Sequence, residues 1–74
     1  METVKQTCEK IENLKDGEHC YFNMFQDGRA VCYKCNGMYL LFEISSFGDE
    51  LYKGAYFKNQ LNDLIEYAFN STRF

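Results

Sequence analysis

Two dipeptides in the middle of the chain constrain its fold more than any other feature. Asp27-Gly28 and Asn36-Gly37 are pairs favoured where a tight β-hairpin needs residues with positive φ. They separate three runs that are rich in strand-forming residues, His19–Gln26, Arg29–Cys35 and Met38–Ser45. The spacing therefore predicts a three-stranded antiparallel meander.

The register of these strands decides which side chains face the core. Two-residue turns would place Phe22 opposite Tyr33, and Tyr33 opposite Leu40. The core face would then hold Cys20, Phe22, Met24, Val31, Tyr33, Cys35, Met38, Leu40, Phe42 and Ile44. The uncovered face would hold His19, Tyr21, Asn23, Phe25, Ala30, Cys32, Lys34, Tyr39, Leu41 and Glu43.

A seven-residue middle strand complicates this register. Its two end residues cannot both form hydrogen-bonded hairpin pairs with opposite neighbours, so one turn needs a three-residue loop or the strand needs a bulge. A slip of one residue would exchange the two faces of a strand. Which hairpin carries the irregularity stays open at the level of sequence.

Helical periodicity flanks the three runs. An amphipathic helix is predicted from about Thr3 to Lys15, with Thr3 and Gln6 as a capping box and Asp16-Gly17 as the stop. Its apolar stripe is Val4, Cys8, Ile11 and Leu14.

The C-terminal part predicts a second helix from about Ala55 to Asn70, after a turn at residues 46–49. Its stripe is Phe57, Leu61, Leu64, Ile65, Ala68 and Phe69. Glu50–Phe57 fits a loop, a short strand or the run into this helix. The expected fold is one α+β domain over residues 1–74, a two-layer sandwich of order α-β-β-β-α with both helices on one face.

Charge and composition narrow the classes of function. The 74 residues carry a net charge of −3 with lysines interleaved among the acids, and no basic stripe marks a phosphate-binding surface. The first 18 residues lack the apolar core of an export signal, and the longest apolar run, Met38–Phe42, is too short to span a bilayer. We therefore expect a cytoplasmic protein with reduced thiols, and neither nucleic acid nor a membrane as its main partner.

Cys32 and Cys35 are the strongest candidates for a metal site. A zinc site needs four ligands, and the other nearby candidates are the neighbours His19 and Cys20. At a spacing of three on a strand, Cys32 and Cys35 point to opposite faces, as do two adjacent residues. We therefore expect free thiols and no cofactor, with zinc bound by Cys20, Cys32 and Cys35 as the alternative.

No catalytic group is marked out by the sequence. His19 is the single histidine, and Ser45, Ser46 and Ser71 are not placed by a nucleophile motif. The five glycines stand singly at turn positions, so they do not form a phosphate-binding loop. We expect a non-catalytic chain without a small-molecule substrate.

The order helix, three strands, helix is similar in topology to double-stranded RNA-binding domains. In that family a lysine cluster at the start of the second helix grips phosphates, and the matching region here offers Lys58 and the nearby Lys53. A nucleic-acid module, either similar to this family or zinc-stabilised through Cys20, Cys32 and Cys35, is therefore the alternative function.

Two helices cover one face of a three-stranded sheet, so the other face is left for a partner. Exposed apolar patches commonly mark interfaces, and Tyr and Phe are enriched there. We expect a protein-binding module that binds another protein or itself, a small acidic regulator or inhibitor of the kind encoded by phages and other mobile elements. The expected contact residues are Tyr21, Phe25, Tyr39 and Leu41.

Overall fold

The computed structural model describes residues 4–24 and 28–70, with the side chains of residues 4 and 70 excepted. The chain is an α+β domain in which a four-stranded antiparallel sheet lies between two helices in sequence. The elements are α1 (Val4–Glu12), β1 (His19–Asn23), β2 (Arg29–Cys35), β3 (Met38–Ile44), β4 (Glu50–Phe57), a 3-10 turn (Lys58–Gln60) and α2 (Leu61–Asn70). No helix of the described part is long and apolar enough to cross a membrane.

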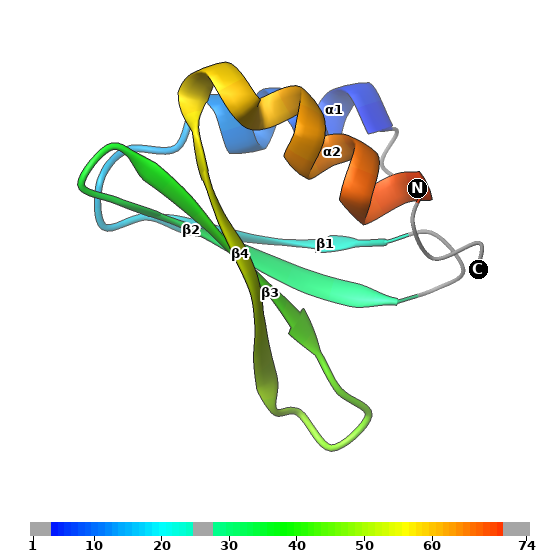
Figure 1. The fold of residues 1–74 in the computed structure, drawn as a ribbon. Coiled ribbons are helices and arrows are strands. Elements are labelled where there is room, and N and C mark those ends of the chain that lie inside the picture. Colours follow the sequence, from blue (N-terminus) through cyan, green and yellow to red (C-terminus); the bar gives the residue numbers. More distant parts are fainter. Residues whose placement is uncertain (1–3, 25–27, 71–74) are drawn as a thin grey trace.

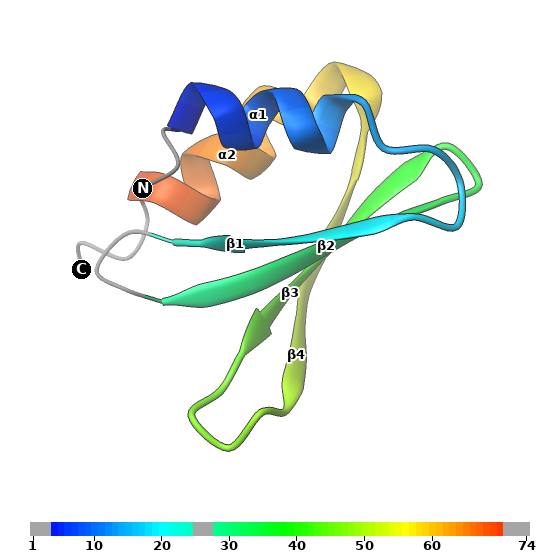
Figure 2. The ribbon, with the colours of Figure 1, turned by 180° about the vertical axis from the view of Figure 1, so that it is seen from behind.

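The molecule has two layers (Figures 1 and 2). Helices α1 and α2 lie on the same side of the sheet, and the strands follow one another in chain order across it. The β3–β4 hairpin extends beyond the helices, at the bottom of Figure 1, so its far end is not covered by the helix layer. Within residues 4–24 and 28–70, both helices cover one side of the sheet, and no helix or strand covers the other side.

The hairpin between β2 and β3 forms as the sequence predicts. Cys35 pairs with Met38 across a two-residue turn, and Tyr33 pairs with Leu40 as the sequence indicates. Asn36 and Gly37 both have positive φ, 51° and 77°, which is the requirement of a type I′ turn.

The first hairpin does not form the expected two-residue turn. Phe22 pairs with Ala30 rather than with Tyr33, and the last pair is Asn23 with Arg29. The Met24 N–H donates to the Gly28 carbonyl oxygen at 2.6 Å, so the connection spans residues 24–28. The observed register of β1 and β2 differs from the predicted one by three residues. Because three is an odd number, the side chains of β2 and β3 that were predicted to share a face with Phe22 lie on the opposite face of the sheet.

The fourth strand corrects the predicted three-stranded meander. Ala55, Tyr56 and Phe57 were expected in the second helix, yet they belong to β4 and pair with β3. The helical segment begins only after Phe57, whose N–H donates to the Gln60 side-chain oxygen at 3.0 Å. The order is α-β-β-β-β-α, and the topological likeness to double-stranded RNA-binding domains is lost with the extra strand.

A bulge in β4 explains why the sequence pattern did not predict this strand. Leu41 pairs with Gly54 and Phe42 with Tyr52, so Lys53 is the extra residue. Gly54 has a φ of 155°, a conformation that favours glycine. The bulge interrupts the two-residue alternation by which strands are recognised.

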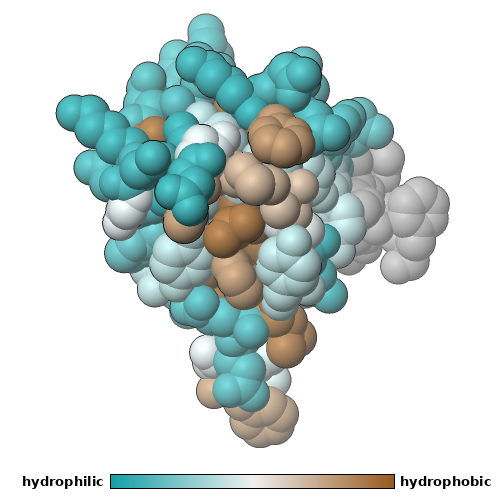
Figure 3. Space-filling model, turned by 60° about the vertical axis from the view of Figure 1, so that its left-hand side comes forward, coloured by the Kyte–Doolittle hydropathy of each residue, from teal (hydrophilic) through white to brown (hydrophobic). Residues whose placement is uncertain are grey.

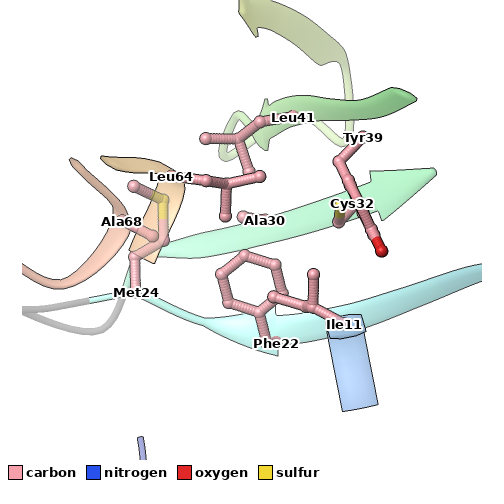
Figure 4. Packing of buried hydrophobic residues seen from close by; sticks show 9 residues of the cluster. All are labelled: Ile11, Phe22, Met24, Ala30, Cys32, Tyr39, Leu41, Leu64 and Ala68. Atoms are coloured by element: carbon pink, nitrogen blue, oxygen red, sulfur yellow. The ribbon is translucent and has the colours of Figure 1, made fainter. Parts of the chain in front are cut away.

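The core lies between the helices and the sheet (Figure 4). Phe22 and Met24 come from the β1 end of the sheet, and the two strands in the middle add four more side chains. The helices contribute three residues that point into the same cluster. The nine residues are Ile11, Phe22, Met24, Ala30, Cys32, Tyr39, Leu41, Leu64 and Ala68.

Two polar side chains of the sheet stabilise the end of α1. The Tyr39 hydroxyl donates to the Glu12 carbonyl oxygen at 3.4 Å, and the Lys34 ammonium donates to the Leu14 carbonyl at 3.3 Å. The Lys34 ammonium also donates to the Tyr39 hydroxyl at 3.2 Å. The Glu12 carbonyl belongs to the last residue of α1, where a helix leaves carbonyls without an intrahelical partner, and Leu14 lies two residues beyond it. They explain how a fully buried tyrosine is accommodated in the core.

Candidate binding surface

The side of the sheet opposite the helices is the candidate binding surface, and we call it the open face. Side chains alternate between the two sides of each strand, so the register assigns the strand residues to one side or the other. The open face comprises His19, Tyr21, Asn23, Arg29, Val31, Tyr33, Cys35, Met38, Leu40, Phe42, Ile44, Glu50, Tyr52, Ala55 and Phe57.

Five aromatic rings form a continuous row across all four strands of this face. The ring centroids of His19 lie 5.4 Å from those of both Tyr21 and Tyr33. The row continues from Tyr33 to Phe42 at 5.5 Å and from Phe42 to Tyr52 at 5.6 Å. The interplanar angles of the last two contacts, 89° and 63°, are those of edge-to-face packing, which aromatic quadrupoles favour.

The aromatic row shields one aliphatic side chain. Val31 is fully buried, although it lies on the side of the sheet without helices. Its direct cross-strand neighbours on that side are Tyr21 and Phe42. Tyr21 and Tyr52 in turn remain 50% and 61% exposed, so the row covers Val31 while presenting its own rings to solvent.

One hydrogen bond orients the Tyr33 ring within the row. The Tyr33 hydroxyl donates to the Glu50 carboxylate, at 2.9 Å and 3.0 Å from its two oxygens. This bond raises the pKa of the Tyr33 phenol, because loss of the proton would bring a phenolate against a carboxylate. Tyr33 thereby extends diagonally over Phe42 from β2 to the start of β4.

A shallow hollow of about 390 Å³ lies beside Tyr33 on the open face. Its lining includes the Tyr33 and Phe42 rings, the Leu40 side chain and Glu50. Figure 3 shows brown, apolar surface gathered in a band through the centre of the view, reaching toward the projecting hairpin at the bottom. The surface can receive apolar side chains of a partner and has an acidic group at its margin.

The sequence-predicted contact residues are only partly on this face. Tyr21 lies on the open face, as expected, and Phe25 falls outside the described residues. The placement of Tyr39 and Leu41 on an uncovered face is wrong, because both are fully buried beneath the helices. The five-residue connection between β1 and β2 accounts for the error, since it turns over the strands that follow.

The cysteine candidates do not converge on one site. Cys32 is buried on the helix side and Cys35 is exposed, which confirms that the pair points to opposite faces. Cys20 pairs with Cys32 across the strands, whereas His19 lies on the open face. Within residues 4–24 and 28–70, no three His, Cys, Asp or Glu side chains are grouped as metal ligands.

The thiol of Cys32 is chemically protected. Burial, with a smaller contribution from the nearby Cys20 and against the opposing effect of Lys34, raises its pKa to about 12. A thiolate is the reactive form, so such a group is a poor nucleophile at neutral pH. The Ser45 hydroxyl, which no nucleophile motif places, accepts hydrogen bonds from the backbone N–H groups of Phe47 and Asp49 in the β3–β4 turn.

Sequence reasoning missed three residues of the surface, Tyr33, Phe42 and Tyr52. The first two were assigned to the core, and the third lies in the segment whose structure was left open. Comparisons with protein families, with characterised proteins and with solved structures found no significant match to this chain. The geometry of the open face is therefore the ground on which a function is proposed.

Proposed function

We propose that this chain is a non-catalytic protein-binding module, a small acidic regulator or inhibitor, and that the open face is its contact surface. The observation that carries the proposal is the aromatic row from His19 to Tyr52, which crosses all four strands and which no helix or strand of the described part of the chain covers. A row of this extent in water forgoes the free energy that a partner would recover by covering it.

The residue types of the row support a protein partner. Tyr and Phe are enriched in protein–protein interfaces, because they offer a large apolar area together with, in tyrosine, a polar tip. Tyr21 and Tyr52 have half or more of their surface exposed, which makes them available for contact without rearrangement of the fold. A tyrosine loses little side-chain entropy on binding, since it has only two χ angles to fix.

The nucleic-acid alternative receives less support from the arrangement of charge. Within the strands, the open face has one cation, Arg29, and one anion, Glu50. Lys53 forms an ion pair with Glu43 at 3.5 Å, and Lys58 lies in the 3-10 turn. These groups do not form the basic groove that accompanies base stacking in single-strand binders.

The proposal is tested by removing aromatic area without disturbing the core. The variant carries Tyr21→Ser and Tyr52→Ser together, and the matched control is Phe47→Ser, which removes a 91% exposed ring from the β3–β4 turn. Each protein is used as bait in a lysate of the native host. We expect partners that are retained by wild type and by the control to be lost from the double variant, because interface aromatics contribute about 2 kcal/mol or more each. Equal retention by all three proteins would contradict the proposal.

A further inference from the structure

We propose that the open face is covered by a second copy of this chain, in a two-fold dimer whose axis lies in the interface and runs parallel to the strands. The inference rests on the proposed function and names the partner of the same surface. Three properties of the face carry it: the order of its residues across the strands, the position of its two charges, and its size.

The register arranges the open face in rows that run across the strands. One row contains Arg29 on β2, Ile44 on β3 and Glu50 on β4, because these residues are successive cross-strand partners. The next row contains Val31, Phe42 and Tyr52, again in strand order. The charges thus stand at one end of the face, and the remaining rows are free of formal charge within the strands.

A two-fold axis between β2 and β3, parallel to them, makes this face complementary to itself. Rotation about it places β2 over β3 and β1 over β4 of the second copy, and leaves each row facing its own counterpart. Arg29 then faces Ile44 of the other copy, with Glu50 of that copy one strand away, about 4.8 Å to the side. Sheets that stack face to face are about 10 Å apart, a gap that Arg29 and Glu50 can bridge.

The apolar contacts of this arrangement are also complementary. Phe42 of one copy lies over the position of Val31 in the other, where the rings that cover Val31 offer the contact, and Tyr33 lies over Leu40. Tyr21 and Tyr52 meet at the two margins, where their exposed hydroxyl ends remain near water. Each contact occurs twice, because the interface of a two-fold dimer is isologous.

The charges discriminate against the other two-fold arrangement. An axis perpendicular to the strands would place β2 over β2 with the rows reversed, so Arg29 would face Cys35 and Glu50 would face Phe57. Both charges would then be buried against uncharged side chains, and an unpaired buried charge is costly. Arg29 forms no ion pair within the described residues, and the hydrogen-bond partner of the Glu50 carboxylate is the neutral Tyr33 hydroxyl.

The size of the face suits a weak dimer. Four strands at about 4.8 Å spacing and seven residues at about 3.3 Å give a plan area of roughly 440 Å². The accessible area of a surface with projecting side chains is larger, which brings it toward the roughly 800 Å² per partner of a standard interface. We therefore expect a dissociation constant on the order of micromolar.

The experiment measures the dimer by sedimentation equilibrium of the full chain from about 1 to about 500 µM, which brackets the expected dissociation constant. Arg29→Glu and Glu50→Arg, made singly, each bring like charges together twice per dimer and should weaken association about tenfold or more. The double variant restores opposite charges with exchanged positions. Its dissociation constant should return to within about threefold of wild type.

Two controls separate the charge effect from local damage. Glu66→Arg reverses an exposed charge on α2, away from the open face, and should leave the dimer unchanged. Tyr33→Phe removes the hydrogen bond that Glu50→Arg also removes, while it keeps the carboxylate, so comparison of the melting temperatures of these two variants shows whether loss of that bond lowers the stability of the monomer. A thermal melt of each variant confirms that the compared proteins are folded.

Each outcome decides the proposal. A wild-type chain that stays monomeric throughout the concentration range overturns it, as do single reversals without effect or a double variant that fails to recover. The proposed function is judged separately, by the loss of captured proteins from the Tyr21→Ser and Tyr52→Ser double variant. A monomeric chain whose open face retains a different protein would refute the dimer and leave the binding module standing.

Discussion

The two faces of the same sheet differ in kind, although both are rich in apolar residues. On the helix face, Ala30, Cys32, Tyr39 and Leu41 are all fully buried. On the open face, Tyr21 and Tyr52 stay half or more exposed. Solvent exposure, rather than apolar content or the presence of aromatic rings, therefore distinguishes the face that packs inside the domain from the face available to a partner.

The same contrast holds for the hydroxyl groups of two tyrosines. The Tyr39 hydroxyl is part of a partly buried set of hydrogen bonds that joins β2 and β3 to the end of α1. The Tyr33 hydroxyl bonds Glu50 in an exposed position. A hydrogen bond inside the protein leaves an unsatisfied group when it is removed, whereas water replaces an exposed one. The two faces should therefore respond differently to the same substitution.

The largest effect is expected from truncating a leucine in the core rather than a leucine on the part of β4 that projects beyond the helices. Leu64→Ala removes a fully buried side chain between α2 and the sheet, and should lower the free energy of unfolding by about 2–5 kcal/mol. Leu51→Ala makes the same change on the projecting part of β4, where the side chain is 47% exposed, and should cost less than about 0.5 kcal/mol. Urea denaturation of both variants measures the difference. Similar losses would mean that the helix layer does not form the core.

The second hairpin and the helical stripes show what the sequence can predict. Asn36-Gly37 has a single favourable solution, a type I′ turn, and the pairing of β2 with β3 followed from it. Ile11, Leu64 and Ala68 were identified by periodicity and are fully buried. These elements depend on local backbone preferences and on helix period, both of which are properties of neighbouring residues.

The first hairpin shows why the candidate site could not be assigned in the same way. Asp27-Gly28 has the composition of a two-residue turn, but β1 ends at Asn23 and the connection includes Gly28. Both sides of these strands are rich in apolar residues. The hydrophobic pattern therefore fits either register and could not decide between them. One unrecognised loop length thus exchanged the assignments of Tyr33 and Tyr39.

The next effect concerns the pH dependence of the helix face. Burial raises the pKa of the Cys32 thiol to about 12 from an ordinary value of 9.0. The neutral thiol is thus favoured by folding: its contribution to stability is complete below pH 9 and is lost as the pH rises from about 9 toward about 12. Cys32→Ala should show a shallower decline of unfolding free energy above about pH 9 than wild type.

Thiol modification gives an independent check of the same comparison. In the folded protein, the exposed Cys35 should react with iodoacetamide well before the buried Cys32, and all four thiols should react in denaturant. We expect no structural zinc, so treatment with a chelator should leave the melting temperature unchanged. A bound structural zinc would contribute folding free energy, and its removal would lower the melting temperature. Rapid modification of Cys32 in the native state would place that residue outside the core.

A smaller effect is expected from Tyr39→Phe on the helix face. The substitution keeps the buried ring and removes the hydroxyl that bonds Lys34 and the Glu12 carbonyl. The expected cost is about 0.5–1.5 kcal/mol, because those two groups lose a partner in a partly buried setting. Tyr52→Phe is the matched control: this side chain is 61% exposed, so water solvates its hydroxyl, and stability should not change. Denaturation midpoints of the two variants, compared at equal m-value, provide the measurement.

The smallest effect is expected from Tyr33→Phe on the open face, the counterpart of Tyr39→Phe. Its hydroxyl bonds the exposed Glu50 carboxylate, which water can solvate in its place, so the denaturation midpoint at neutral pH should match that of wild type. The bond can be detected instead by titrating the Tyr33 phenol, because it raises the pKa of that group. Glu50→Gln should lower that pKa toward the ordinary value for tyrosine, as followed by the ring carbon shifts in NMR, and should leave the Tyr39 signals in place. By linkage, wild type and Tyr33→Phe should differ in stability only as the pH rises above the ordinary tyrosine pKa, where ionisation of the phenol beside Glu50 lowers the stability of wild type but not of Tyr33→Phe. If Tyr33→Phe destabilised the fold as much as Tyr39→Phe, the open face would be part of the core, and the distinction between the two faces would fail.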